Sequence, residues 1–205
     1  MNSDVFQRQR YPLLIVISGP SGVGKDTVLE SMRRRRLPFH FVVTATSRPQ
    51  RPGEVDGEDY FFVSREQFEA MVEHGELIEH ALVYNQYKGI PKQQVLDALA
   101  SGQDVIMRID VQGAATVRRL YPEALLIFLT TRSAEELVGR LKSRETETPE
   151  SLRLRLTTAR QELEQWGLFD YLVVNADGQL DEAVDTISAI IQAEHHRTRP
   201  RRVTL

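Results

Sequence analysis

The sequence predicts an α/β fold: a parallel sheet flanked by helices, with an inserted α+β subdomain and a short helical lid. Two observations carry this prediction. Short continuous apolar runs, typical of strands that are buried on both faces, recur along the chain. Stretches with helical spacing of apolar residues separate these runs, and such alternation builds a parallel sheet with crossover helices.

Five apolar runs are the expected strands of the main sheet, and four amphipathic stretches are its expected helices. The strands span residues 13–17, 39–43, 104–109, 124–129 and 171–174. The helices span residues 25–36, 111–120, 134–144 and 180–194. Together they define a core domain made of residues 11–43, 103–143 and 168–195.

Two regions interrupt this alternation. The longer, 44–102, contains Pro and Gly turns between short segments, so we expect an inserted subdomain of mixed α and β structure. Its expected elements are strands at 60–63 and 77–83 and helices at 65–74 and 92–100. The shorter region, 144–167, begins with a polar stretch and continues as a charged helix, which is the expected lid.

The end of the chain is a basic tail, residues 196–205, which we expect to be frayed. His195 and His196 could bind a metal at the start of this tail, but a solvated tail is the favoured interpretation. The tail therefore carries no predicted function.

Composition excludes several classes of function. The 205 residues are 41% apolar and 27% charged, which is typical of one globular domain. A net charge of −3 offers no basic excess for nucleic acid or membrane surfaces. The absence of cysteine excludes disulfides and thiolate chemistry, and no run approaches the roughly 18 apolar residues of a membrane span. We expect a cytoplasmic protein, with no obligate protein partner evident.

The sharpest motif lies between the first expected strand and the first expected helix. It reads G-P-S-G-V-G-K over residues 19–25. The glycines let backbone N–H groups converge on phosphate oxygens, and Lys25 adds charge at the β- and γ-phosphates. The alternative, a glycine-rich turn without a ligand, is disfavoured by the strand–loop–helix setting. The motif predicts a P-loop NTPase-type core.

The residue after the lysine departs from this motif. A Ser or Thr hydroxyl that touches Mg²⁺ usually follows, whereas here Asp26 follows and Thr27 comes next. A carboxylate beside phosphates repels them unless a metal or water lies between. Asp26 could reach Mg²⁺ through water or could cap the helix, and the sequence leaves both options open.

A second candidate site begins at residue 44. Arg48 and Arg51 lie three apart in a loop braced by Pro and Gly, and such a fork suits a phosphate group. Tyr60 could add a hydroxyl donor. Solvated surface charge is an equally good interpretation from the spacing alone.

The segment 44–62 carries a family resemblance. It reads T-x-T-S-R-P-x-R-P-G-E-x-D-G-x-D-Y-F-F, which resembles the GMP-binding region of guanylate kinases, and G-P-S-G-V-G-K resembles the ATP loop of that family. Further matching motifs extend the resemblance over roughly residues 13–195. It implies a nucleoside monophosphate kinase that transfers the γ-phosphate of ATP to GMP, and to dGMP, with Mg²⁺.

The resemblance also implies roles for individual residues. The carboxylates of Glu79 and Asp110 match those that accept hydrogen bonds from guanine N1–H and the 2-amino group, and Thr44 matches a donor to guanine O6. The full implied GMP site is Thr44, Arg48, Arg51, Tyr60, Glu79, Lys88 and Asp110. The implied ATP site is Gly19, Pro20, Ser21, Gly22, Val23, Gly24, Lys25, Asp26, Thr27 and Asn175. The implied catalytic cations are Lys25, Arg140, Arg144 and Arg155.

Two positions depart from the commonest family pattern. Many members read Tyr-Tyr-Gly-Thr/Ser where this chain has Tyr87-Lys88-Gly89-Ile90. Lys88 keeps a donor and adds charge at the GMP phosphate, while Ile90 removes a hydroxyl near guanine O6. The Lys-Gly-Ile-Pro-Lys version resembles a plant organelle-type branch of the family.

Two other functions remain to be weighed. A kinase for another phosphorylated acceptor, such as a ribose bisphosphate, should lack the complete set of implied GMP contacts. A catalytically inactive module that binds phosphopeptides should have a degraded phosphate loop, whereas this chain keeps Lys25.

Overall fold

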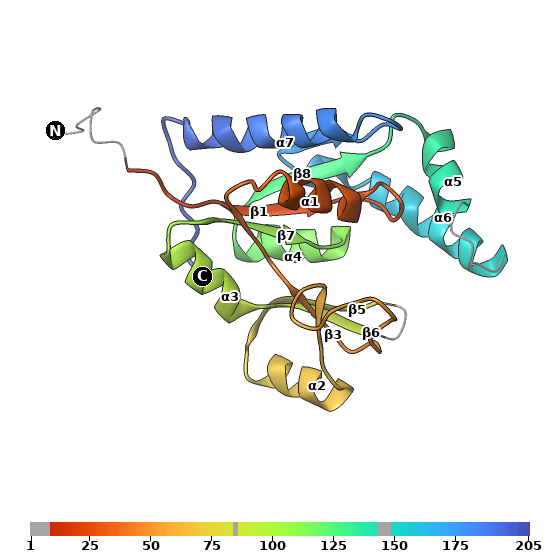
Figure 1. Cartoon of the computed structure of the whole chain (residues 1–205), viewed down its shortest axis with the longest axis horizontal. Coiled ribbons are helices and arrows are strands. Elements are labelled where there is room, and N and C mark those ends of the chain that lie inside the picture. The colour runs from red at the N-terminus through yellow and green to blue at the C-terminus, as the bar shows by residue number, and fades with distance from the viewer. Residues whose placement is uncertain (1–8, 84–85, 143–148) are drawn as a thin grey trace.

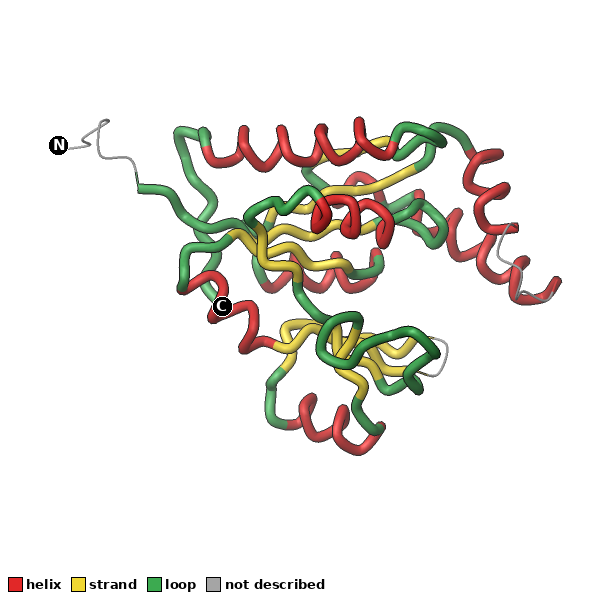
Figure 2. The backbone as a smooth tube through the Cα atoms, viewed as in Figure 1, coloured by secondary structure: helices red, strands yellow, loops and turns green. Residues whose placement is uncertain are grey.

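The central sheet of the computed structural model has five parallel strands in the order β2-β7-β1-β8-β9 (Figures 1 and 2). The structure describes residues 9–83, 86–142 and 149–205. The strands are β1 (Leu14–Ser18), β2 (Phe39–Phe41), β7 (Asp104–Arg108), β8 (Leu125–Thr130) and β9 (Tyr171–Val174). The α/β fold and the parallel main sheet are confirmed.

The middle strand, β1, shows why these strands form unbroken apolar runs in the sequence. All five of its residues are buried. Leu14 and Val16 belong to one apolar cluster, and Ile15 and Ile17 belong to a second one. Side chains alternate between the two faces of a strand, so β1 must be apolar throughout when helices cover both faces.

Helices pack on both faces of the sheet (Figure 1). On one face α1 (Lys25–Arg34) and α7 (Leu180–His195) contact each other and enclose the cluster that contains Ile15. On the other face α3 (Lys92–Ala100) and α4 (Val111–Leu120) cover the cluster that contains Leu14. The loop before α1 and the start of α4 thereby follow neighbouring parallel strands, at the sheet edge where α/β folds bind ligands.

A separate four-stranded sheet lies beside the core, in the order β4-β3-β6-β5 (Figure 1). Its strands are β3 (Thr44–Thr46), β4 (Tyr60–Phe62), β5 (Leu77–Val83) and β6 (Gln86–Pro91), and α2 (Arg65–Glu73) follows β4. β3 pairs with β4 in parallel and with β6 in antiparallel orientation, and β5 and β6 are antiparallel. The expected inserted region is therefore a mixed α+β unit.

The sequence patterns do not predict two strands of this sheet, β3 and β6. β3 has only three residues, too few to show an alternation. β6 contains Lys88 and Gly89 and ends at Pro91, three residue types that are depleted in strands. Pairing with β3 and β5, rather than local propensity, holds this segment extended.

The helix expected in the lid is α6 (Pro149–Leu163), which packs against α5 (Ala134–Lys142). A short 3₁₀ helix, Trp166–Leu168, leads from it to β9. The polar stretch before α6 lies outside the described residues. Among the residues that are described, no helix is long and apolar enough to cross a membrane.

The expectation of a frayed tail is wrong. Arg201 is only 8% exposed, and its guanidinium Nε donates to Oε2 of Glu194 at 2.7 Å. Val203 and Leu205 pack against the apolar cluster beneath α4. His195 contacts the buried carboxylate of Asp104 at 2.7 Å and does not point into solvent. A buried ion pair and two apolar anchors fix the tail where composition alone suggested fraying.

Candidate active site

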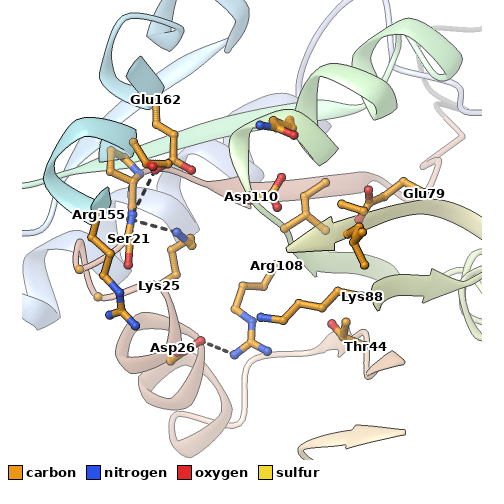
Figure 3. Close-up of a pocket in the computed structure, with 18 of the residues that line it drawn as sticks. Ser21, Lys25, Asp26, Thr44, Glu79, Lys88, Arg108, Asp110, Arg155 and Glu162 are labelled. Atoms are coloured by element: carbon orange, nitrogen blue, oxygen red, sulfur yellow. Dashed lines mark hydrogen bonds and ion pairs between the residues drawn. The ribbon is translucent and has the colours of Figure 1, made fainter. Parts of the chain in front are cut away.

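A cavity of about 500 Å³ opens between the two sheets. Its walls come from four parts of the chain: the phosphate loop with the start of α1, the end of β7 with the start of α4, the second sheet, and α6. Figure 3 shows side chains from all four converging on this space. The cavity therefore joins the predicted phosphate loop to the predicted acceptor residues.

Glycines make the curve of the phosphate loop. Gly24 has a φ of 88°, and a Cβ there would lie 2.5 Å from Nδ2 of Asn175. Gly19 has a φ of 142°, and its Cβ would lie 2.2 Å from the carbonyl oxygen of Leu129. Any other residue at these two positions would have a strained backbone and would displace the neighbouring atoms. α1 begins without a side-chain cap, which leaves its first N–H groups available to an anion.

Lys25, the first residue of α1, is folded back onto its own loop. Its Nζ donates to the carbonyl oxygens of Gly19 and of Pro20, the latter at 3.0 Å. Burial lowers the pKa of Lys25 to about 8, although the nearby carboxylate of Glu162 opposes this shift. Desolvation makes the ammonium costly at this position, and the negative charge of a triphosphate bound to the loop would stabilise it.

Four of the predicted acceptor residues that line the cavity come from four different strands of the second sheet: Thr44, Tyr60, Glu79 and Lys88. A fifth, Asp110, comes from the core, where it caps α4 by accepting a hydrogen bond from the backbone N–H of Gly113 at 2.7 Å. Five residues dispersed over 67 positions are therefore gathered at one wall by tertiary structure.

Glu79 is the most desolvated carboxyl of this wall, with 7% of the residue exposed. Burial, together with the charge of Asp110, raises the pKa of Glu79 to about 8. Gly113 makes room for it, since a Cβ there would lie 2.9 Å from Oε2 of Glu79. A buried carboxyl of this kind can discriminate strongly between ligands, because one without matching donors leaves it unpaired.

Arg48 and Arg51 do not line the cavity. The buried guanidinium of Arg48 donates twice to the Glu54 carboxylate and lies over the ring of Tyr60, 4.8 Å from its centroid. Arg48 holds the pKa of Glu54 at about 2, with help from the backbone N–H of Arg51. Ile90 is also outside the cavity, fully buried in the apolar core.

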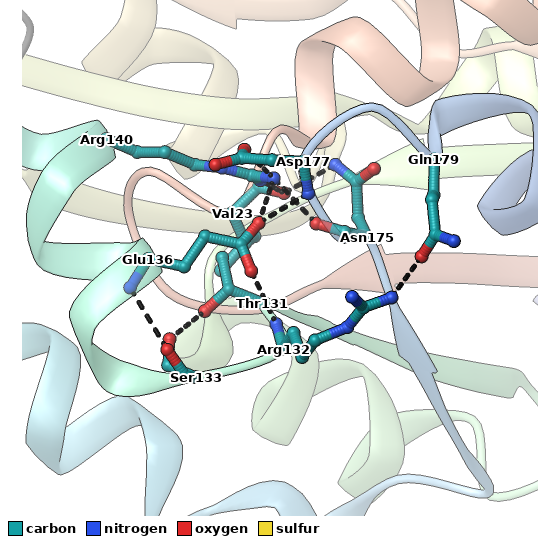
Figure 4. Close-up of polar contacts among 9 residues, drawn as sticks. All are labelled: Val23, Thr131, Arg132, Ser133, Glu136, Arg140, Asn175, Asp177 and Gln179. Atoms are coloured by element: carbon teal, nitrogen blue, oxygen red, sulfur yellow. Dashed lines mark hydrogen bonds and ion pairs between the residues drawn. The ribbon is translucent and has the colours of Figure 1, made fainter.

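Arg140 and Asn175 lie at a second, smaller depression of about 290 Å³, behind the phosphate loop. Arg140 donates to Glu136 at 2.6 Å, to Asp177 at 2.7 Å and to the carbonyl oxygen of Asn175 at 2.8 Å (Figure 4). The Asn175 side chain donates to the carbonyl oxygen of Val23 at 2.9 Å. Arg155 instead lines the main cavity, and Arg144 lies outside the described residues.

Comparison with known proteins identifies the family. The sequence profile of the family described as guanylate kinase matches residues 11–194. The chain belongs to the guanylate kinase family.

Relatives of known sequence and structure agree with this membership. A rice (Oryza sativa subsp. japonica) protein named guanylate kinase 2, chloroplastic/mitochondrial, is 52% identical over 95% of this chain and 68% of its own length. A guanylate kinase of Halalkalibacterium halodurans is 48% identical over 89% of both chains. The crystal structure of guanylate kinase from Anaplasma phagocytophilum has a TM-score of 0.74 and 32% identity, over 93% of this chain and 89% of that one.

Two charged cavity residues of this guanylate kinase family member, Arg108 and Glu162, are missed by the sequence reasoning. Arg108 ends β7, and the signal for it is a charge at the carboxyl end of an otherwise apolar strand. Glu162 on α6 lies near Lys25, and its Oε2 is 3.4 Å from the backbone nitrogen of Ser21. Burial raises the pKa of Glu162, and no local pattern marks it in the sequence.

The structure overturns one of the two options that the sequence position of Asp26 suggested. Gly24, not Asp26, is the N-cap of α1, so the helix-cap interpretation is wrong. The carboxylate of Asp26 is paired with the guanidinium of Arg108 across the cavity. Contact with a metal through water stays a prediction.

Proposed function

We propose that the chain catalyses transfer of the γ-phosphate of ATP to GMP, giving ADP and GDP, and that it also accepts dGMP. Membership of the guanylate kinase family supports this activity. The observation that carries it is the single cavity that unites a phosphate loop with the buried carboxyl of Glu79. The proposal includes the division into a core, an acceptor subdomain of residues 44–102 and a lid of residues 144–167.

The donor half of the site is the phosphate loop of residues 19–25 with Asp26 and Thr27. Its backbone N–H groups and the Lys25 ammonium hold the β- and γ-phosphates of ATP. The adenine lies toward the depression at Asn175, where Arg140 braces the back of the loop.

The acceptor half selects guanine. Glu79 and Asp110 accept hydrogen bonds from N1–H and the 2-amino group, while Thr44 donates to O6. Adenine has no N1 hydrogen and would leave a desolvated carboxylate unpaired, which is the kind of mismatch that costs several orders of magnitude in rate.

The GMP phosphate is held by Tyr60 and Lys88, which line the cavity. Arg48 and Arg51 join them when the phosphate takes the place of the Glu54 carboxylate. Because Glu54 accepts two hydrogen bonds from Arg48, its carboxylate occupies the position that the phosphate takes in this proposal.

In the transfer step, an oxygen of the GMP phosphate attacks the γ-phosphorus of ATP in line. The new P–O bond forms as the bond to the β,γ-bridging oxygen breaks, and ADP leaves with that electron pair. The acceptor phosphate is already ionised, so no general base is needed. Lys25, Arg155, Arg140 and Arg144 balance the charge, and closure of the lid excludes water.

Mg²⁺ fits this site as a companion of ATP. Within the described parts of the chain, no group of three or more His, Cys, Asp or Glu could hold a metal ion. Mg²⁺ commonly uses one or two carboxylates, waters and substrate phosphates, and the Asp26 side chain, 72% exposed, can supply such a carboxylate through water. When bound, the ion neutralises phosphate charge.

A coupled ADP-release assay with GMP, dGMP, AMP, UMP and ribose 1,5-bisphosphate tests the proposal. We expect turnover with GMP and dGMP only. No turnover with millimolar GMP would refute it, and preference for the ribose bisphosphate would establish the rival acceptor. The cytoplasmic location stays a prediction, because the rice relative carries a chloroplastic and mitochondrial name.

A further inference from the structure

One cation in the cavity has no role in the proposed mechanism so far. Arg108 is the last residue of β7, two positions before Asp110, and its side chain is 23% exposed. The guanidinium nitrogen Nη1 is paired with Asp26 on α1, and Nη2 donates to the hydroxyl of Tyr60 at 3.0 Å. Figure 3 shows the guanidinium in the cavity between Asp26 and Lys88. Arg108 thus connects the donor half of the site to the acceptor half.

We propose that Arg108 is a further catalytic residue, whose guanidinium contacts the phosphoryl group as it passes from ATP to GMP, and that Asp26 is the positioning residue that aims it. The inference rests on the proposed function and adds an assignment to it.

The first argument is location. Asp26 follows Lys25, the proposed ligand of the β- and γ-phosphates, and Tyr60 is a proposed ligand of the acceptor phosphate. A guanidinium bonded to both Asp26 and Tyr60 must lie between the two phosphates that react. Charge spreads over the oxygens of the transferred group in the transition state, so a cation at this point stabilises it more than either substrate.

The second argument is donor capacity. A guanidinium carries five N–H groups in a planar fork, and the described contacts of Arg108 use two of them. Arg108 lines the cavity, so further donors can reach phosphate oxygens there. Lysine could match the charge but not a fork that serves Asp26, Tyr60 and a phosphate together.

The third argument concerns the carboxylate beside the phosphate loop. Alone, Asp26 would repel ATP, but the charge of Arg108 offsets it. Most of the Asp26 side chain is exposed, so water screens the pair, and the remaining N–H groups of Arg108 can reach a phosphate oxygen while the pair stays formed. The pair therefore keeps Arg108 in place before substrates arrive, at little cost when they bind. One oxygen of Asp26 makes this pairing, so a water-mediated metal contact through the other stays compatible.

The experiment compares Arg108→Met, Arg108→Lys, Asp26→Asn and the double variant Arg108→Met/Asp26→Asn with the parent in the GMP-dependent ADP-release assay. Arg35→Met is the matched control, since Arg35 makes ion pairs with Asp181 and Asp185 on α7, outside the cavity. For every variant, kcat, the KM for ATP and for GMP, the Mg²⁺ dependence and the melting temperature are measured.

For Arg108→Met we expect kcat to fall by about 10²–10³-fold, the usual cost of losing a donor to transition-state charge, with little change in the KM for ATP. Arg108→Lys should recover part of this loss. Asp26→Asn should lower kcat by about tenfold in the parent and hardly at all in the Arg108→Met background, since two residues that act through one group are not additive. Arg35→Met should match the parent in kcat.

Two results would overturn the inference. A folded Arg108→Met variant with kcat within about threefold of the parent would remove the catalytic role of Arg108. An Asp26→Asn loss of kcat that is as large in the Arg108→Met background as in the parent, together with a raised Mg²⁺ requirement, would make Asp26 a metal ligand and not a positioning residue. A parent enzyme inactive with GMP would instead refute the proposed function itself, so the two failures are distinguishable.

Discussion

The phosphate loop and the acceptor wall are two halves of one cavity, but they are built in opposite ways. The loop is seven consecutive residues, and its shape comes from backbone: glycines with positive φ, N–H groups and the start of α1. The acceptor wall is made of side chains from four strands and a helix cap, and tertiary structure alone brings them together.

This difference determines how each half should respond to mutation. A backbone site keeps its shape when one side chain is changed, so removing its single cation should abolish chemistry and leave the fold intact. A side-chain site depends on burial and on neighbours, so small changes should alter specificity, pH dependence or affinity in graded ways.

The largest effect is expected at the loop, from Lys25→Met. Loss of the only lysine in the loop should lower kcat by about 10³-fold or more, the scale of phosphoryl-transfer cations, while circular dichroism and the melting temperature stay near the parent values. Lys92→Met, at the start of α3 and outside the cavity, is the matched control. A Lys25→Met variant with parent-like kcat would show that the loop does not hold the triphosphate.

The next effect is expected at the wall, from Glu79→Gln. The amide keeps the shape but places an N–H₂ group toward guanine donors, so kcat/KM for GMP should fall by about 10²–10³-fold and the preference for GMP over AMP should shrink. Glu76→Gln, three residues earlier and exposed, is the control. An unchanged ratio of GMP to AMP turnover would exclude Glu79 from base selection.

A smaller, graded effect is expected from pH. Burial raises the pKa of Glu79 to about 8, so below that pH the Glu79 carboxyl is protonated before GMP binds. GMP binding requires the ionised carboxylate as a hydrogen-bond acceptor, so this proton must leave. The KM for GMP should therefore rise as pH falls below about 8, by at most about tenfold per pH unit for a single proton. Glu79→Gln should lose this dependence, and a flat profile in the parent would contradict the assignment.

The same proton affects unfolding. Between the ordinary carboxyl pKa of 4.5 and the raised pKa of about 8, the folded chain binds a proton at Glu79 that the unfolded chain has released. With more protons bound in the folded state, the free energy of unfolding falls as pH rises through this window. Denaturant titrations of the parent and of Glu79→Gln should differ in that slope, which separates a titrating Glu79 from a pH effect on GMP itself.

The contrast between the two halves also explains what sequence can reveal. The loop of residues 19–25 and strand β1 are predictable because their signals are contiguous: an apolar run buried on both faces, then glycines and a lysine. Glu79 looks like any surface acid in the sequence, and only family resemblance marks it. Arg108 and Glu162 carry no such mark, because their importance arises from neighbours 82 and 141 positions away.

The parts of the fold that the sequence patterns did not predict are also decided by long-range contacts. The tail looks polar and frayed, but Arg201 finds a buried partner in Glu194, and Val203 and Leu205 find an apolar surface. Strand β6 lacks strand propensity, but two neighbouring strands supply its hydrogen bonds. In each case a long-range contact, absent from any local window, decides the structure.

The smallest expected effect compares two glycines within helices. A Cβ at Gly113, on α4, would lie 2.9 Å from Oε2 and 3.0 Å from Cδ of Glu79, whereas a Cβ at Gly139, on α5, meets nothing within 4 Å. Glycine costs a helix interior about 1 kcal/mol relative to alanine, so Gly139→Ala should raise the melting temperature and leave both KM values unchanged.

Gly113→Ala, in the first turn of α4, pushes the Glu79 carboxyl by a few tenths of an ångström. Because the wall works through the placement of that carboxyl, the KM for GMP should rise a few-fold while the KM for ATP stays at the parent value. Steady-state kinetics with each substrate varied in turn will measure the KM for GMP and the KM for ATP separately. Equal KM values for GMP in the two alanine variants would mean that the acceptor wall tolerates a small displacement of the Glu79 carboxyl. The two halves of the cavity would then differ in how they are built, but not in how strongly they respond to mutation.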